Sequence, residues 1–446
     1  MSHRPLTLHS QARITYETHG SHHFFGYYDK CPWNKSGETL LALEADFLDR
    51  LPGPQDAARI GAINLSRGGS FHAFAETRAW NWQQGAMLQW LPPKEEFSVI
   101  FNDLRGDKFV SSIFDIRDGK EKRELPFPIY SLHPSGRHAL SLNFSRLDNV
   151  REGYGYKGIR DKRVGNPAPA DDGIYRINLE TGDVSLLLSL AQLRSHQFVG
   201  SMDEGKHWVD HLAFSPNGDQ FAFLHRWQLK NGGMHSRFCA MRFNPVASGV
   251  DSQTPSVLLD SGMASHFIWR NNRELVIWGR PLGFSTSITK PGLLRKILVP
   301  VYHALVRSSG SRQKISGDAF LSFIFEDGAW RTKKPLALGR GIIKEDGHCS
   351  FSPDGEWLLT DTYPTKDHFR VLELFHRGSG KKAEIGRFYS LPERKFGVGP
   401  GWDLSALRSD LHPRWNRNGT AVCIDSVHSG ARQMHVIDIQ SMLNSH

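Results

Sequence analysis

The sequence predicts an all-β fold, a seven-bladed β-propeller of four-stranded antiparallel blades. One hairpin pattern recurs seven times along the 446 residues: a short run, a polar turn with Gly or Asn, and a hydrophobic run. Two more strand-like runs follow most of these hairpins, and stretches with helical periodicity are few. Strands this short cannot bury both of their faces alone, so we expect the units to stack radially around an axis.

The seven units predict one continuous domain, residues 1–446. The expected blades are approximately 13–82, 83–126, 127–192, 205–260, 261–342, 343–400 and 401–446. The strand-like run at residues 13–17 is expected to complete the last blade and close the ring. A pair of β-sandwiches is the alternative architecture, but it does not account for one hairpin repeated seven times.

Residues 291–308 depart from this pattern. They have helical periodicity with a basic face, and Pro300 would kink a helix there. We expect a short helical insertion in the fifth blade. It is either a lid or basic amphipathic element that touches a membrane or a partner, or a solvent-facing segment packed on the blade.

The composition limits the cellular compartment in which the protein is expected and the roles of its cysteines. No apolar run is long enough to span a bilayer, and the first residues lack the apolar core of a signal peptide. We expect a cytoplasmic protein, or a periplasmic one if a signal has been removed. The four cysteines are far apart without paired spacing, which indicates small buried residues and neither a disulfide framework nor a zinc ribbon.

The net charge of +9 favours a polyanionic ligand: an acidic polysaccharide, nucleic acid or anionic lipid. The sequence has no recognition helix, zinc finger or RNA-binding signature. It also lacks the Gly-x-Ser-x-Gly elbow, the Walker loop and the dinucleotide-binding turn. An acidic saccharide is therefore the expected partner, and nucleic acid is not expected.

Four histidines occupy one position of the repeat, each read as His-x-x-aromatic before a polar turn: His211, His266, His348 and His412. Equivalent points of consecutive blades converge on the axis. Neighbouring imidazoles oppose joint protonation, and a divalent metal (Mn, Zn, Fe or Ni) would take their neutral nitrogens as ligands. Asp346 and Asp410 could orient the rings. The alternatives are inter-blade hydrogen bonding, binding of anionic sugars, or acid–base chemistry.

A second polar ring is expected on the same rim. Fourteen residues after the histidines stand His225, Arg280, Thr362 and Ser426. A strand and its antiparallel partner bring these ends to one side of the sheet. We assign catalytic roles to His225 and Arg280. Further residues expected to bind substrate on this rim are Asn102, Arg226, Tyr363 and Arg414.

The third blade carries a separate cluster. Tyr130 begins it, and Asn143 and Arg146 lie at the end of its second strand. Arginine pairs with a carboxylate while tyrosine moves a proton, so we assign catalytic roles to Tyr130 and Arg146. In the loop that follows, Tyr154 and Tyr156 suit stacking on sugar rings; the alternative is a turn packed on the neighbouring blade.

Residues 22–30, which open the first blade, concentrate polar aromatic side chains just before Trp33. By the register of the repeat they lie on the same rim as the histidines. We expect this segment to form part of the wall of the site, with Tyr28 as a substrate-binding residue.

The Phe-Ser-Pro-Asn-Gly and Phe-Ser-Pro-Asp-Gly turns at 214–218 and 351–355 resemble the TolB-type propeller repeat. The rim with several histidines resembles the oligogalacturonate lyase family, which implies a divalent metal held by a histidine cluster. Tyr130 with Arg146 is similar to the Tyr–Arg pair of ulvan-lyase-type propellers. Those families also use histidines on an earlier blade, where this chain has Gln84 and Asn102.

The resemblance implies a lyase that cleaves a uronate-containing saccharide by β-elimination. Two alternatives remain. A glycoside hydrolase on the same fold would need an acidic pair, for which Asp361 and Asp425 are the candidates. A non-catalytic TolB-like interaction or glycan-binding scaffold would not need this density of His, Arg and Tyr.

Overall fold

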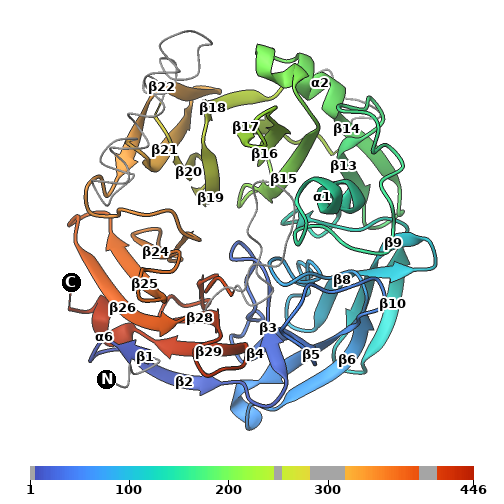
Figure 1. The fold of residues 1–446 in the computed structure, drawn as a ribbon. Helices are drawn as coiled ribbons and strands as arrows, with labels where there is room; N and C mark the ends of the chain where they lie inside the picture. Colours follow the sequence, from blue (N-terminus) through green and yellow to red (C-terminus); the bar gives the residue numbers. More distant parts are fainter. Residues whose placement is uncertain (1–5, 246–253, 282–316, 391–408, 446) are drawn as a thin grey trace.

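Seven antiparallel sheets are arranged around a central axis, which confirms the predicted seven-bladed β-propeller (Figure 1). The structure, a computed structural model, describes residues 6–245, 254–281, 317–390 and 409–445. The helical insertion expected near 291–308 lies outside these residues. None of the helices in the described ranges has the length and apolar character needed to cross a membrane.

The first three blades follow the chain in order. Blade 1 contains β3 (His22–Phe24), β4 (Thr39–Ala45), β5 (Ala58–Asn64) and β6 (Phe71–Thr77). Blade 2 contains β7 (Gln89–Trp90), β8 (Ser98–Arg105), β9 (Lys108–Asp115) and β10 (Lys120–Leu125). Blade 3 contains β11 (Ser131–Leu132), β12 (His138–Ser141), β13 (Gly173–Asn178) and β14 (Val184–Ser189).

The next two blades have longer strands. Blade 4 contains β15 (His207–Phe214), β16 (Gln220–Gln228), β17 (Met234–Arg242) and β18 (Ser256–Gly262). Blade 5 contains β19 (Ala264–Asn271), β20 (Glu274–Gly279), β21 (Ala319–Glu326) and β22 (Ala329–Leu338).

The last two blades recruit the N-terminal strands. Blade 6 contains β23 (Ser350–Phe351), β24 (Trp357–Asp361), β25 (Phe369–His376) and β26 (Lys382–Tyr389), with β1 (Leu6–Leu8) added at its edge. Blade 7 contains β27 (Arg414–Trp415), β28 (Ala421–Ser426), β29 (Gln433–Asp438) and β2 (Arg13–Glu17). The antiparallel pairing of β2 with β29 confirms the expected closure of the ring.

Short helices occur within the blades, between blades 3 and 4, and after the last strand: α1 (Phe144–Val150), α2 (Leu190–Ser195), α6 (Gln440–Leu443), and the 3-10 turns Leu65–Arg67 and Gly200–Asp203. Helix α1 begins where we expect the end of a strand. The side chain of Asn143 accepts a hydrogen bond from the backbone N–H of Arg146. This N-cap satisfies a donor at the helix start and favours a helix over strand continuation.

The core lies between the blades, because the strands bury both faces. All residues of β4 and of β15 are buried. One hydrophobic cluster joins Phe24 of blade 1, Val99 of blade 2 and Met434 of blade 7. Apolar contact between neighbouring sheets therefore supplies the burial that single short strands cannot achieve.

The repeated turn glycines bring neighbouring blades close together. A Cβ added at Gly136 in blade 3 would lie 1.7 Å from the carbonyl oxygen of Pro92 in blade 2. A Cβ at Gly218 in blade 4 would lie 2.1 Å from Nε2 of His133 in blade 3. Gly37, in the equivalent turn of blade 1, has nothing within 4 Å. Glycine thus allows the positive φ in all three of these turns. In blades 3 and 4 its missing side chain also lets the neighbouring blade approach closely.

Gly136→Ala is expected to destabilise the protein much more than Gly37→Ala. Both residues have a positive φ, 69° and 79°, so alanine at either site loses about 1 kcal/mol to backbone strain. At Gly136 the new methyl group also overlaps a backbone atom, which adds about 2 kcal/mol or more. Denaturant unfolding of the two variants measures the difference, and equal losses would contradict the inter-blade contact.

Candidate functional site

The structure brings the four repeated histidines together around one aromatic side chain. His211, His266, His348 and His412 are 1%, 5%, 2% and 0% exposed. The ring centroid of Tyr28 lies 5.3, 5.7, 5.3 and 6.3 Å from those of the four imidazoles, in the same order. Consecutive blades therefore deliver their equivalent histidines to one buried cluster, as the spacing of the repeat predicts.

Local backbone geometry turns these histidines inward. His211 and His412 have φ of 50° and 43°, a left-handed conformation that is uncommon outside glycine. The pairing of β15 with β16 shifts register between Asp210 and Ala213, so His211 stands in a β-bulge. Bulges and strained residues of this kind re-aim side chains and are held in place by surrounding contacts.

Three of the histidines have their Nδ1 atom satisfied by an acceptor. Nδ1 of His348 lies 2.9 Å from the Asp361 carboxylate, and Nδ1 of His266 lies 2.9 Å from that of Asp346. Nδ1 of His412 lies 2.9 Å from the carbonyl oxygen of Gly26. Because these oxygens only accept, Nδ1 carries the proton and Nε2 carries the lone pair. A carboxylate or carbonyl behind the ring is the usual support of a metal-binding histidine.

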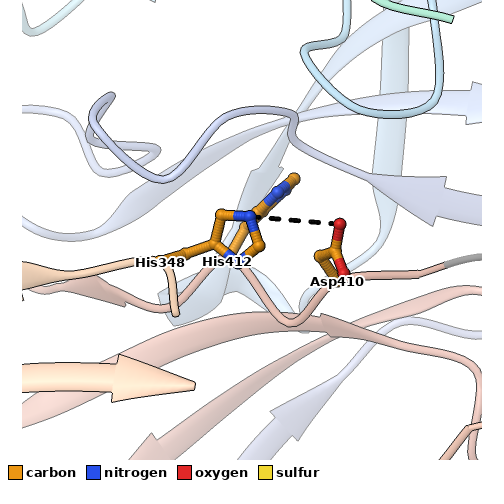
Figure 2. A group of neighbouring side chains, drawn as sticks. All are labelled: His348, Asp410 and His412. Carbon is orange, nitrogen blue, oxygen red and sulfur yellow. Dashed lines mark ion pairs between the residues drawn. The ribbon is translucent and has the colours of Figure 1, made fainter. Parts of the chain in front are cut away.

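The lone-pair nitrogens face a carboxylate. Nε2 of His348 and Nε2 of His412 are buried, and neither has a hydrogen-bond partner among the described residues. His348, His412 and Asp410 form a group in which one possible ligand atom from each residue lies within 4.8 Å of the other two. Figure 2 shows this group, with Oδ2 of Asp410 3.9 Å from Nε2 of His348. Nitrogen and oxygen donors in this arrangement suit a divalent metal ion.

Burial favours the neutral form of two of these imidazoles, His266 and His412. It lowers the pKa of His412 well below the usual value, and the neighbouring His348 lowers it further. Burial also lowers the pKa of His266, although the Asp346 carboxylate acts in the opposite direction. Neutral imidazole is the form that binds metal, so no proton has to be displaced from these rings at neutral pH.

His211 has different partners. Its Nε2 lies 3.4 Å from Oδ2 of Asp29, and the same oxygen is 2.6 Å from Nζ of Lys30. Burial alone would raise the pKa of Asp29, but Lys30 and His211 together hold that pKa well below its usual value. The fourth predicted ligand therefore belongs to an ion-pair group beside the other three.

Arg414, which we expect to bind substrate, holds the backbone beside Tyr28. Its guanidinium donates to the carbonyl oxygens of Gly26 and Tyr27, and pairs with Asp425 at 3.2 Å. The hydroxyl of Tyr28 donates to the carbonyl of Phe267 at 3.0 Å and accepts from the N–H of Phe267 at 2.9 Å. These bonds fix the segment that fills the centre of the histidine cluster.

The Tyr130–Arg146 pair expected on the third blade has no direct contact among the described residues. The Tyr130 hydroxyl accepts a hydrogen bond from the side chain of Gln84, at 2.9 Å. Arg146 pairs with Asp161 at 3.3 Å and donates to the carbonyl of His207 at 2.7 Å. Burial also raises the pKa of Tyr130 well above the usual value. Arg146 sits elsewhere because Asn143 starts helix α1 at this point.

Four other predicted substrate-binding residues have partners within the protein. The Asn102 amide donates to the carbonyl of Ile129, and that of Asn143 to Asp172, both at 2.8 Å. The rings of Tyr156 and Phe144 stack with centroids 4.3 Å apart. Arg151 stacks on the ring of Tyr154 at 3.5 Å. These contacts agree with the alternative of a loop packed on its neighbours, and binding roles for the four residues remain predictions.

The second polar ring divides into separate environments. Arg226 is buried and pairs with Asp210 at 3.0 Å. Arg280 is partly exposed and contacts both carboxylate oxygens of Asp318, at 2.8 and 3.0 Å. Tyr363 is half-buried, and its ring centroid lies 6.4 and 6.5 Å from those of His266 and His348. Tyr363 thus stands beside the histidine cluster.

Several carboxylates contact the histidine cluster more closely than the sequence predicts. Asp361 accepts from Nδ1 and the backbone N–H of His348, and from the backbone N–H of Leu411 in the next blade. Asp346 contacts the histidine of the preceding blade, and Asp410 lies among the lone-pair nitrogens. The sequence signal was an aspartate two residues before a repeated histidine. It located Asp346 and Asp410, but neither Asp361 nor the blade on which the histidine partner of Asp346 lies.

Comparisons with known proteins agree with the fold. No known family profile and no curated protein sequence matches this chain. An oligogalacturonate lyase in complex with manganese matches with a TM-score of 0.56 at 13% identity, over 93% of this chain and 90% of that chain. The oligogalacturonate lyase of Vibrio parahaemolyticus matches with a TM-score of 0.53 at 10% identity, over 94% and 91%.

TolB from Acinetobacter baumannii has a TM-score of 0.36 at 12% identity, covering 76% of this chain and 61% of that chain. That score carries no argument beyond the general resemblance. The likeness to the two lyases, at these identities, shows the fold alone. Fold and site together define a β-propeller with a buried histidine–aspartate group at its centre.

His225, for which we expect a catalytic role, forms a hydrogen-bonded pair with His207. Nε2 of His207 donates to the carbonyl of Met202 at 2.7 Å, so its Nδ1 accepts from Nε2 of His225 at 2.9 Å. Burial lowers the pKa of His207 to about 4, and that of His225 well below its usual value. The ring of His207 must remain neutral for its Nδ1 to accept this hydrogen bond.

The free energy of unfolding is expected to decrease as the pH is lowered, because of the buried His207–His225 pair. Histidine in an unfolded chain has a pKa near ~6.5, whereas the pKa of His207 in the folded protein is about 4. Between these two pH values the unfolded chain therefore binds more protons than the folded protein. His207 alone would remove up to about 3 kcal/mol across this window. His207→Gln keeps the donor to Met202 and should flatten the dependence in urea unfolding, whereas His72→Gln on exposed β6 should not. An unchanged slope in His207→Gln would contradict the neutral pair.

Proposed function

We propose that the protein is a metal-dependent lyase that cleaves a uronate-containing saccharide by β-elimination. The observation that carries the proposal is the pair of buried, unpartnered Nε2 atoms of His348 and His412 beside Asp410. Buried polar atoms without partners are rare in folded proteins, and here both belong to residues that form one group with Asp410. The structural likeness to a manganese-bound oligogalacturonate lyase and the net charge of +9 support the choice of metal and of acidic substrate.

His348, His412 and Asp410 would hold the ion, and His266, whose ring centroid lies 4.1 Å from that of His348, would add a further nitrogen ligand. Manganese is favoured over zinc, iron or nickel by the likeness to that lyase. The bound ion would act as a Lewis acid that neutralises the uronate carboxylate and makes the C5 proton acidic. Asp346 and Asp361 would hold the rings of His266 and His348 in the orientation needed.

Two partly exposed groups on the predicted rim, Arg280 and Tyr363, suit the rest of the reaction. Arg280 would bind the uronate carboxylate through its planar guanidinium. A general base would take the C5 proton, the electrons of that C–H bond would form the C4–C5 double bond, and the C4–O bond would break with its electron pair leaving on the oxygen. The Tyr363 hydroxyl, beside His266 and His348, would return a proton to the leaving oxygen.

The contacts of the acidic pair do not favour a glycoside hydrolase. Asp361 accepts hydrogen bonds from His348 and from neighbouring backbone N–H groups, and Asp425 is paired with Arg414. Both carboxylates are almost fully buried, at 1% and 0% exposure. A general acid and base need contact with the glycosidic bond or with water. A non-catalytic scaffold would not need buried, unpartnered histidine nitrogens beside a carboxylate.

His412→Ala is expected to abolish stoichiometric metal binding, whereas His211→Ala should retain it. His412 belongs to the group with His348 and Asp410, whereas Nε2 of His211 lies 3.4 Å from Oδ2 of Asp29. Loss of a ligand should weaken manganese affinity by more than about 100-fold. Elemental analysis and calorimetric titration of the folded variants measure this. Equal loss of metal in both would contradict the ligand set, and a metal-free wild type unaffected by chelator would contradict the metal itself.

The protein is expected to generate unsaturated uronate from at least one member of a polyuronate panel. The conjugated product absorbs in the ultraviolet, so the reaction can be followed continuously. Chelator should abolish the signal and added manganese should restore it. A neutral polysaccharide serves as the control substrate. Absence of a signal from every polyuronate, with and without manganese, would contradict the lyase proposal.

A further inference from the structure

Three arginines and two aspartates form a buried charge cluster between blades 6, 7 and 1. Arg370 pairs with Asp410 at 2.7 Å, and Arg414 pairs with Asp425 at 3.2 Å. Arg432, just before β29, is the third guanidinium and is 0% exposed. Each of these two carboxylates is therefore already paired with an arginine other than Arg432.

Arg432 has no hydrogen bond at any guanidinium nitrogen among the described residues. Nε, Nη1 and Nη2 are all buried and unpartnered. The nearest carboxylate oxygen, Oδ2 of Asp425, lies 3.7 Å from Nη2, beyond hydrogen-bond distance. That oxygen already accepts from Arg414 at 3.2 Å. Five N–H donors of one buried side chain are thus left without an acceptor.

The surroundings do not supply the missing acceptor. The guanidinium carbon of Arg432 lies 5.0 Å from the ring centroid of Phe24 and 5.3 Å from that of Trp82. Aromatic faces attract a cation but accept hydrogen bonds poorly. Burial lowers the pKa of Arg432 to about 10, so the group is still charged at neutral pH. A buried charge without hydrogen bonds strongly disfavours folding, so a bound partner is expected.

We propose that Arg432 binds a small monovalent anion such as chloride, enclosed between blades 1 and 7. One negative charge balances the third arginine, and a halide accepts the N–H donors of its guanidinium. Complete burial against Phe24 and Trp82 favours a small inorganic ion over a sugar carboxylate. The proposal is independent of lyase activity, because it rests on the unpaired donors of Arg432 and concerns a separate ligand.

The anion is expected to stabilise the folded protein in a saturable manner. At constant ionic strength, replacing gluconate by chloride should raise Tm by about 2 °C or more and reach a plateau. Crystals soaked in bromide should show an anomalous peak within hydrogen-bond distance of the Arg432 guanidinium. An ordered water at that position, together with equal Tm in the two salts, would overturn the proposal.

Substitutions test whether the effect of chloride on Tm arises at Arg432. Arg432→Met should have the same Tm in chloride and in gluconate. Arg237→Met is the matched control, since Arg237 is also buried but is paired with Asp260 at 2.9 Å. It should destabilise the protein yet keep the chloride response. A chloride response of Tm that persists in Arg432→Met would overturn the assignment. If that variant does not fold, the same comparison is made with Arg432→Lys, and the bromide map of the wild type shows whether an anion lies at the guanidinium.

Discussion

The pairing of β2 with β29 is the constraint on which the rest of the structure depends. It joins Arg13–Glu17 to the last blade and closes the ring of sheets. Closure places the inner hairpin of blade 7 against the first blade, so Nδ1 of His412 reaches the carbonyl of Gly26, 386 residues away in the chain. Figure 1 shows the two ends of the chain meeting at this joint. Without it, histidines from the later blades would have no common centre.

Burial gives the site its chemical character. Desolvation favours neutral imidazole, and acceptors behind three of the rings fix the proton on Nδ1. The Nε2 atoms are then directed to the interior as lone-pair donors. The same burial makes every remaining charge costly, which explains the paired arginines around Asp410 and Asp425. Arg432 is the exception, and its unpaired donors are the reason to expect a bound anion.

The repeat pattern predicted the architecture and the convergence of the histidines, because equivalent positions of equivalent blades must face the same axis. It could not separate His211 from the other three. That separation depends on Asp29, which reaches Nε2 of His211 from a segment more than 180 residues earlier. The Tyr130–Arg146 pair failed to form for a local reason, since Asn143 caps a helix where the repeat predicts a strand end.

The sequence by itself determined the number of blades, the closing strand, and the set of histidines that would meet at the centre. These properties follow from periodicity, which acts along the chain. Only the tertiary structure decided which nitrogen of each ring is free, which carboxylate supports which histidine, and which arginine has no acceptor. Those outcomes depend on contacts between blades, where distance in space and burial matter, and neither is encoded by the spacing of residues in one repeat.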